Sequence, residues 1–206
     1  MKRFQLCLLM AAAIFMAGPV YAYTLNFDEL STPNNDGGQL WGTVPITYNG
    51  FNWAGSWEVA DQNSYKSTYN NTYNFASPTK AVYNDTGSLV MTLTNGSSFN
   101  FESASFSTWA QNNAFQSFSA TTLTITGYQD NVMVGSPITF NLKSNMFELQ
   151  NINLLNIDEV RFQANASGKW WLMDNFTYTN APIPGAVWLL GTGIVGLVAM
   201  RRKFQK

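Results

Sequence analysis

The chain has 206 residues, of which 46% are hydrophobic and 15% aromatic, and its formal net charge is −1. It contains no histidine, which excludes Ser-His-Asp and Cys-His catalysis and every zinc site that uses histidine ligands. Cys7 is the only cysteine, so zinc sites built from cysteines and disulfides within one chain are excluded as well.

Residues 1–22 have the order of a secretory signal peptide. Lys2 and Arg3 precede an apolar core over residues 6–17, which contains the only cysteine. The segment ends in Val-Tyr-Ala, which places small residues at the −3 and −1 positions of a cleavage site after Ala22. We therefore expect export and a mature domain that lacks cysteine.

The expected exported domain covers residues 23–180. Its 158 residues are enough for one domain with a substantial core. It holds 12 acidic and five basic side chains, which gives a net charge of −7. An acidic and lightly charged domain argues against binding to nucleic acid or to an anionic membrane.

Alternation of apolar and polar residues, the period of a half-buried strand, dominates this domain. It predicts strands at 24–27, 89–94, 99–106, 122–126, 132–134, 138–142, 160–162 and 169–178. The stretch 121–142 is expected to form a hairpin, and a change of phase predicts a bulge near Glu102 and Ser103. Residues 151–156 are expected to form a loop or a short helical turn.

No segment of the domain shows clear helical periodicity. About eight to ten short antiparallel strands in this length predict a sandwich or a barrel. We expect an all-β fold, namely a jelly-roll-like antiparallel β-sandwich.

Aromatic residues crowd the first third of the domain, among asparagine, glycine and serine. They are Trp41, Tyr48, Phe51, Trp53, Trp57, Tyr65, Tyr69 and Tyr73. Exposed rings flanked by amides suit sugar recognition, since rings stack on C–H faces while amides bond to hydroxyls. We therefore predict a sugar site at Trp57, Tyr65, Tyr69 and Tyr73. The alternative for Phe51, Trp53 and Trp57 is the core, and Tyr65, Tyr69 and Tyr73 are expected to be exposed.

Asp174 stands in phase with large apolar residues of the last strand. If that strand is regular, Asp174 shares a face with Trp170, Leu172, Phe176 and Tyr178. A carboxylate on a core face is costly unless it is paired, hydrogen-bonded or bound to a metal.

The first strand ends in Asp28 and Glu29, and the first and last strands of a jelly roll tend to lie close together. Asp28 or Glu29 is therefore predicted to share a cation with Asp174, and Ca²⁺ suits such oxygen ligands. The alternative is that Asp174 lies at a strand margin and accepts hydrogen bonds from the backbone.

The segment from Ala181 to Lys206 has the pattern of a membrane anchor. Pro182 and Pro184 lack amide donors and favour extended backbone before them, so a helix is expected to begin at about residue 184. The 18 residues from Ile183 to Met200 carry no charge, and a membrane-spanning helix needs about 20 apolar residues, with a lower limit of about 17. The basic residues that follow are expected on the cytoplasmic side, namely Arg201, Arg202, Lys203 and Lys206.

We therefore expect a transmembrane helix over 184–200 and a basic end over 201–206. The alternative is a buried C-terminal helix of the domain, although such a helix rarely lacks a polar face.

Beyond its hydropathy, the same segment contains a specific sequence motif. After the two prolines and Gly185 the chain reads AVWLLGTG, which includes Trp188, Gly191 and Gly193, and a Gly-Leu pair and the basic cluster follow. This pattern resembles a PEP-CTERM sorting tail, in the variant that runs VPLPAAVWLFGSGLLGL before basic residues. The chain departs from the family pattern at Ile183. The Pro-Glu-Pro motif that gives the family its name has glutamate at this position.

The resemblance implies recognition by an exosortase, a membrane transpeptidase-like enzyme of Gram-negative bacteria. It also implies removal of the helix near Pro184 and release or attachment of the domain at the cell surface.

Three short motifs extend the resemblance to the domain. Asn26–Leu30 reads NFDEL, Tyr48–Trp53 reads YNGFNW, and Met173–Phe176 reads MDNF. They are similar to motifs that frame an exported β-sandwich often found before PEP-CTERM tails. The implied fold is similar to galactose-binding-like carbohydrate modules.

Walker A and G-x-S-x-G patterns are absent from the sequence, so P-loop nucleotide binding and hydrolase-elbow chemistry have no support. Residues 191–196 read GTGIVG and match G-x-G-x-x-G, but they lie inside the uncharged tail and not between a strand and a helix of a dinucleotide-binding unit. We expect a non-enzymatic cell-surface or matrix protein that is associated with exopolysaccharide or biofilm. A carbohydrate-binding module is the second hypothesis. A small glycosidase that uses a carboxylate pair is the third.

Overall fold

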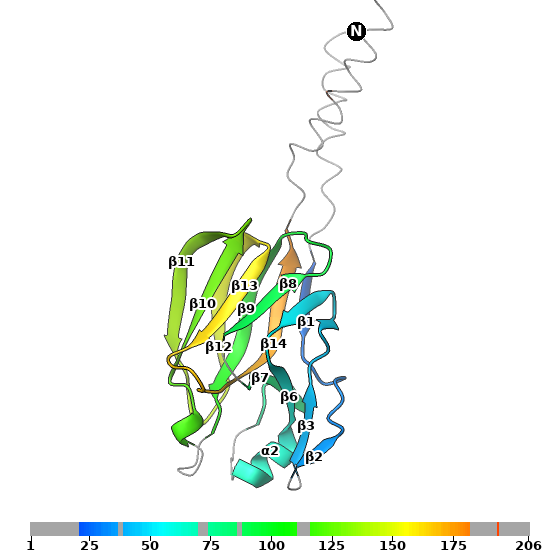
Figure 1. Cartoon of the computed structure of the whole chain (residues 1–206), viewed down its shortest axis with the longest axis vertical. Helices are drawn as coiled ribbons and strands as arrows, with labels where there is room; N and C mark the ends of the chain where they lie inside the picture. Colours follow the sequence, from blue (N-terminus) through cyan, green and yellow to red (C-terminus); the bar gives the residue numbers. More distant parts are fainter. Residues whose placement is uncertain are drawn as a thin grey trace, which may run out of the picture. The chain divides into compact units, whose positions relative to one another are not determined.

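The alternating segments form strands in two antiparallel sheets, so the all-β prediction is confirmed (Figure 1). The computed structural model describes residues 21–36, 39–69, 74–85, 88–110, 116–181 and 193. Residues 22–181 form one compact unit. Both sheets and their core lie within this unit, so it contains what it needs to fold by itself.

The larger sheet has eight strands, in the order β12-β9-β14-β7-β6-β3-β2, with β1 paired to β14. Its strands are β1 (Ala22–Leu25), β2 (Asn34–Asp36), β3 (Gln39–Thr43), β6 (Trp57–Asp61), β7 (Lys80–Asn84), β9 (Phe99–Thr108), β12 (Glu148–Ile157) and β14 (Trp171–Asn180). The predicted proximity of the first and last strands is confirmed, because Ala22 pairs with Thr179 and Leu25 with Phe176.

The smaller sheet has six strands, in the order β11-β10-β13-β8-β5-β4. They are β4 (Thr47–Tyr48), β5 (Phe51–Ala54), β8 (Leu89–Leu93), β10 (Thr122–Gln129), β11 (Val132–Asn141) and β13 (Glu159–Ala164). β10 and β11 form the predicted hairpin. Its turn, Asp130-Asn131, has positive φ at both residues, which matches the twist of the flanking strands.

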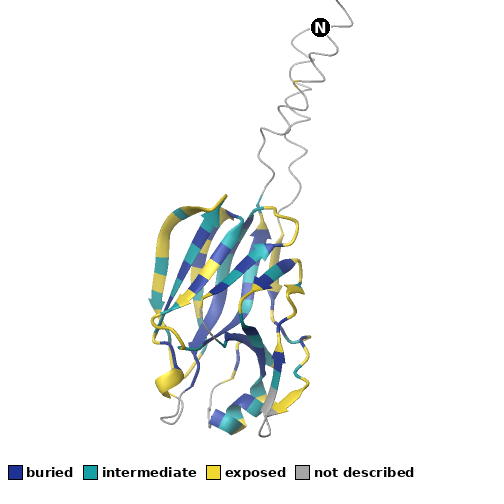
Figure 2. Ribbon diagram, in the orientation of Figure 1, coloured by how far each residue is buried: buried dark blue, intermediate teal, exposed yellow. Residues whose placement is uncertain are grey.

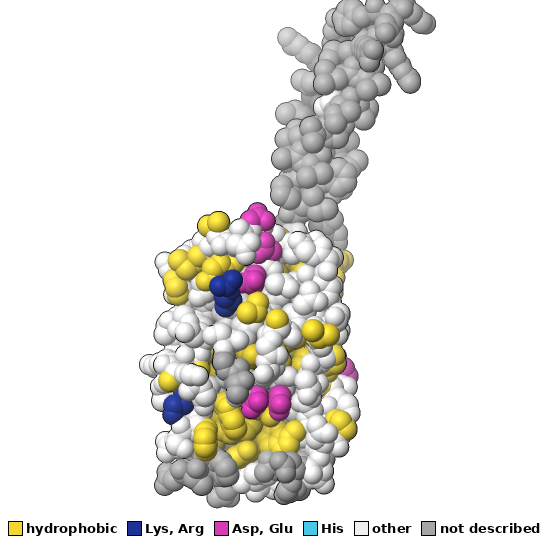
Figure 3. Space-filling model, in the orientation of Figure 1, with side chains coloured by type: hydrophobic (Ala, Val, Ile, Leu, Met, Phe, Trp, Pro, Cys, Tyr) yellow, Lys and Arg dark blue, Asp and Glu magenta, His cyan; other side chains and the backbone are white. Residues whose placement is uncertain are grey.

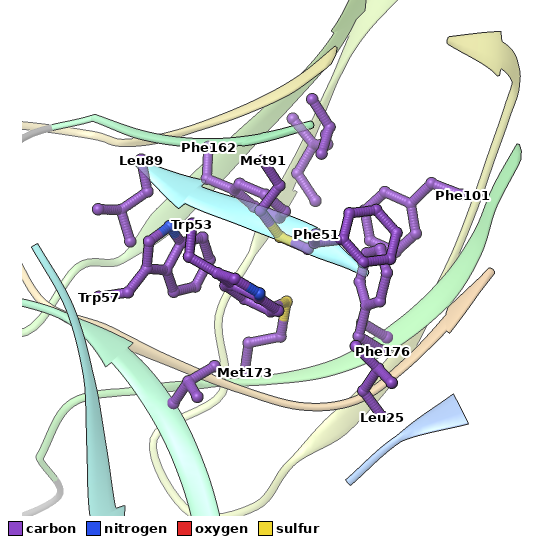
Figure 4. Close-up of a cluster of buried hydrophobic side chains, with 14 of the residues drawn as sticks. Leu25, Phe51, Trp53, Trp57, Leu89, Met91, Phe101, Phe162, Met173 and Phe176 are labelled. Atoms are coloured by element: carbon purple, nitrogen blue, oxygen red, sulfur yellow. The ribbon is translucent and has the colours of Figure 1, made fainter. Parts of the chain in front are cut away.

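The core lies between the two sheets and is rich in aromatic side chains (Figure 4). Phe51 makes edge contacts with Phe99 and Phe176, at ring-centroid distances of 5.1 and 5.5 Å. Trp53 and Trp57 meet at 5.0 Å and 87°. Edge-to-face contacts of this kind add to the stabilisation that comes from burial alone.

Two strands change phase where they bulge. In β9, Phe101 and Ala104 are both buried and the register shifts between them, which confirms the predicted bulge. In β14, Met173 and Phe176 are both in the core, because a bulge lies at Asn175, whose φ is +50°. Asparagine tolerates this conformation better than most residues.

The bulge in β14 corrects the prediction for the last strand. Asp174 does not share a face with Phe176 and Tyr178, since the phase changes between them. Asp174 instead faces the other side of the eight-stranded sheet, with Leu172.

A second aromatic cluster packs on that side of the sheet. It contains Ala60, Tyr65, Tyr69, Phe75, Ala81, Tyr83, Trp109, Ala110 and Leu172. Two of its tyrosines come from the helix α2 (Gln62–Tyr69), which the sequence analysis did not predict. Asp61 caps this helix, because its Oδ1 accepts hydrogen bonds from the amides of Asn63 and Ser64, both at 3.1 Å.

Other expectations for the fold are also corrected. Residues 151–156 are neither a helical turn nor a loop but part of β12, which bends at positive-φ residues Asn153 and Asn156. The described residues form 14 strands and not eight to ten, because several very short strands pair in the first third of the domain. A single 3₁₀ turn, Gln116–Phe118, lies before β10.

The structure does not test the two predicted membrane-directed segments. The signal peptide and the sorting tail lie outside the described residues, apart from Tyr21, Ala22, Ala181 and Gly193. The helices within the described ranges are too short or too polar to span a bilayer.

Candidate functional site

Asp28 and Asp174 both bind Ser77, so the structure brings these two predicted site residues together. The Oδ2 of Asp174 accepts a hydrogen bond from the amide of Ser77 at 2.5 Å, and its Oδ1 accepts one from the amide of Asn175 at 2.7 Å. The hydroxyl of Ser77 donates to Asp28 at 3.2 Å. Asp174 is fully buried. The backbone hydrogen bonds agree with the alternative interpretation, but Asp174 lies within β14 and not at the margin of a strand.

Asp28 accepts hydrogen bonds from the segment that leads into β7. Its Oδ1 accepts hydrogen bonds from the amides of Thr79 and Lys80, at 3.0 and 2.9 Å, and from the hydroxyl of Thr79 at 2.8 Å. Since Ser77 joins Asp28 to Asp174, the two carboxylates hold the segment 77–80 against β1 and β14.

Burial raises the pKa of Asp174 to about 7. The amides of Ser77 and Asn175 oppose this rise because they favour the charged form, and the negative charge of Asp28 adds slightly to it.

Glu29 lies in a separate network. Its Oε1 accepts hydrogen bonds from the hydroxyl of Tyr48 at 2.5 Å and from the side-chain Nδ2 of Asn49 at 3.0 Å. The bond from Tyr48 is the main reason why the pKa of Glu29 is lowered. Burial, followed by the hydrogen bond to this carboxylate, raises the pKa of Tyr48.

These contacts do not favour the predicted calcium site. The Oδ1 of Asp28 and both oxygens of Asp174 already accept hydrogen bonds from N–H or O–H donors, whereas Ca²⁺ requires several oxygen ligands directed at the ion. Within the described ranges, no group of three or more histidine, cysteine, aspartate or glutamate residues is placed to hold a metal. Calcium binding by Asp28, Glu29 and Asp174 stays a prediction.

The aromatic sugar site is not formed on the surface as predicted. Trp57 is 1% exposed and lies in the core between the sheets, which was the alternative for this residue. Tyr65 and Tyr69 are 0% and 6% exposed, so the expectation that they lie on the surface is wrong. They are buried because they are four residues apart on α2 and both face the sheet. Tyr73 lies outside the described residues.

The structure instead presents a polar face on the six-stranded sheet. In β13, Val160 and Phe162 are fully buried, so the residues that alternate with them, Glu159, Arg161 and Gln163, point away from the core. The neighbouring strands β10 and β8 alternate in the same way. Their outward residues include Thr126 and Tyr128 in β10 and Val90 in β8.

Arg161 is the centre of this face. Its partners across the strands are Thr126 and Val90. Its guanidinium carbon lies 4.0 Å from the centre of the Tyr128 ring, a cation–π contact. Its Nε donates to the carboxylate of Glu159, which raises the pKa of Arg161. These contacts hold the guanidinium flat on the ring and leave 44% of the side chain exposed.

A hollow of about 410 Å³ follows these side chains. Its lining consists of Ser88, Val90, Thr126, Tyr128, Glu159, Arg161 and Gln163. A second hollow of about 270 Å³ also includes Glu159, together with Asp158 and Asn131. We call the two hollows together the sheet groove. Figure 3 looks onto this side of the domain and shows mainly neutral surface with few charged side chains.

The sheet groove offers the contacts that a sugar chain requires. Hydroxyl and amide groups can donate and accept, the carboxylates accept, and the guanidinium donates. The Tyr128 ring adds an apolar surface with a polar end.

Sequence reasoning did not single out these residues. Two features of the sequence point to them, namely the alternation of the three strands and the fact that Arg161 is the only arginine between residues 23 and 180.

No protein-family model matches the chain, and no curated protein matches it. Among solved structures, the K2 cleaved adhesin domain of Lys-gingipain is similar at a TM-score of 0.39 and 12% identity, over 76% of this chain and 97% of that one. An F5/8 type C domain of a Bacteroides fragilis protein is similar at a TM-score of 0.33 and 11% identity, over 70% of this chain and 99% of that one.

Proposed function

We propose that the chain is an exported, non-enzymatic protein of the cell surface or extracellular matrix, and that its β domain binds polysaccharide through the sheet groove. The sandwich is further proposed to be of the jelly-roll, galactose-binding-like type that the three sequence motifs imply. Processing of the tail by an exosortase would place the domain at the surface of a Gram-negative bacterium, in contact with exopolysaccharide or biofilm.

The two ends of the chain support export and surface location. Residues 1–22 have the order of a signal peptide, and residues 182–206 have the Pro-x-Pro, apolar and basic order of a sorting tail. The domain between them has a low content of charged residues, which is compatible with a polar but neutral partner.

The contact between Arg161 and Tyr128 is the observation that supports polysaccharide binding. It combines an exposed donor and an aromatic face on a rigid sheet, and groups placed on strands are held more firmly than groups on loops. The two hollows share Glu159 in their lining, so an extended chain of sugars would reach both, whereas one compact ligand would occupy one of them.

Substitution of Tyr128 and of Arg161 tests the proposal. We expect Tyr128→Ala and Arg161→Ala each to weaken binding to exopolysaccharide by about tenfold, or about 1.4 kcal/mol. Affinity electrophoresis of residues 23–181 in gels that contain the polysaccharide measures this. Tyr23→Ala is a matched control, because Tyr23 is 46% exposed and lies on β1, outside the groove.

Equal retardation of the wild type and both variants would rule out the sheet groove as the site. Release of reducing sugar by the wild-type domain would contradict the non-enzymatic part of the proposal.

A further inference from the structure

β11 forms one end of the six-stranded sheet and pairs only with β10. It is ten residues long, and every residue in it is exposed or half-buried, as Figure 2 shows along its length. Along its outer side, the described residues provide no further strand. Such an edge presents a row of backbone donors and acceptors to which another strand can be added.

The two arms of this edge lack the charged side chains that often discourage such pairing in natural edge strands. Val132–Asn141 contains no charged residue, although the domain as a whole has a net charge of −7. The middle of the strand is interrupted by a bulge, where the register with β10 shifts, Gly135 has a φ of +69° and Pro137 lacks an amide donor. Pairing is therefore open to the arms 132–134 and 138–141 and not to the middle.

Both end strands carry exposed apolar side chains. Val132 and Met133 of β11 are 68% and 48% exposed. Met146, Leu149 and Leu155, which lie in or just before β12, are 49%, 59% and 58% exposed. β12 is the end strand of the other sheet and contacts β11. Cover by a protein partner would remove such apolar surface from water.

The charges at the two ends of β11 indicate which partner fits. Asp130 precedes the strand and Lys143 follows it, and both are exposed. If two copies of β11 pair antiparallel about a two-fold axis, the Asp130 end of each copy meets the Lys143 end of the other. The interruption at residues 135–137 then falls near the axis, so residues 132–134 of each copy meet residues 138–141 of the other on either side of it.

We propose that β11 pairs antiparallel with β11 of a second copy of this chain, which joins the two six-stranded sheets into one continuous sheet. The charge pattern is self-complementary in this arrangement, and an isologous contact of this kind closes at two copies. The larger hollow of the sheet groove lies on β8, β10 and β13, so pairing along β11 leaves that hollow open in both copies. The dimer would present two grooves on one sheet, which raises the apparent affinity for a long polysaccharide.

Cysteine cross-linking tests the contact directly, because residues 23–181 contain no cysteine. We expect Ser136→Cys, near the two-fold axis, to form covalent dimers when the purified domain is treated with a short bifunctional maleimide. Ile46→Cys is the matched control, since Ile46 is 76% exposed and lies between β3 and β4. Equal cross-linking of the two variants, or none at Ser136→Cys, would overturn the proposal.

A charge exchange tests the antiparallel arrangement. Lys143→Glu places acidic groups against acidic groups and is expected to raise the dimer dissociation constant about tenfold in sedimentation equilibrium. Asp130→Lys combined with Lys143→Glu restores opposite charges and is expected to restore dimerisation. Circular dichroism and thermal unfolding verify that each variant is folded.

Dimerisation that does not respond to Lys143→Glu would contradict the arrangement, as would failure of a folded double variant to recover. A domain that stays monomeric but captures an extended peptide along β11 would assign the edge to a different partner and would likewise overturn the proposal.

Discussion

Asp174 is an acidic residue in an environment that disfavours its charged form. It is fully buried, yet its two oxygens face the amides of Ser77 and Asn175. Its pKa is about 7 in the folded domain, against 3.8 for the free side chain. This pKa difference of about three units corresponds to a free-energy difference of roughly 4 kcal/mol between the two protonation states.

The raised pKa predicts that the domain loses stability as pH increases. The folded state holds the proton of Asp174 more tightly than the unfolded state, so its contribution is fully present below about pH 4 and is lost as pH rises through about 7. We expect the free energy of unfolding, measured in urea, to fall by up to about 4 kcal/mol between pH 4 and pH 8. Asp174→Asn should flatten this dependence, whereas Asp85→Asn, which lies outside the hydrogen bonds of Asp174, should keep it. Parallel pH profiles for the wild type and Asp174→Asn would show that Asp174 is not the cause.

At the scale of elements, α2 is the clearest addition that the structure makes to the sequence. The helix has little apolar surface, and the residues that attach it to the sheet are Tyr65 and Tyr69, whose rings lie 5.1 Å apart. Tyr65 also contacts Phe75 and Trp109, at 5.3 and 5.4 Å. The helix therefore depends on these aromatic contacts more than on its own propensity.

Removal of the Tyr65 ring should be costly. We expect Tyr65→Ala to lower the free energy of unfolding by about 3–5 kcal/mol, as for other buried aromatic side chains. Asn63→Ala, on the exposed side of the same helix, should change it by less than about 0.5 kcal/mol. Urea denaturation monitored by tryptophan fluorescence measures both. A small effect of Tyr65→Ala would contradict the burial of the helix.

The sequence was sufficient for the elements that have regular alternation. β8 and the β10–β11 hairpin follow from period-2 patterns and turn residues. The proximity of β1 and β14 was expected from the sandwich fold itself. The helix α2 was missed because its apolar positions are tyrosines in a polar stretch. The capping residue Asp61 and the spacing of Tyr65 and Tyr69 were its only signs.

The candidate site was less predictable for two physical reasons. The bulge at Asn175 reverses the faces of β14 halfway along, so a strict alternation assigns Asp174 to the wrong side. The sheet groove combines Val90, Tyr128 and Arg161 from three strands, and only their register brings them together. Neither the bulge nor the register can be read from one strand alone.

At the scale of the whole molecule, the proposed processing makes a prediction about mass. We expect the protein isolated from cells that contain an exosortase to lack its predicted signal peptide and to end near Pro184. Intact-mass spectrometry distinguishes this from a chain that retains Lys206. The same gene expressed in a strain without exosortase serves as the control and should yield the longer chain. Retention of Lys206 in both strains would contradict processing.

The position of β14 also determines how the domain carries a load. A pull on Asn180 along the strand acts on the hydrogen bonds to β9, which run from Trp171 to Asn180, and on those to β1. These bonds lie across the direction of pull and share the force, so they must break together and not one after another. If the domain is attached at Asn180 and its groove binds a polymer, a pulling force along β14 would act parallel to the strands, that is, in shear. A sheet resists mechanical rupture best in this direction.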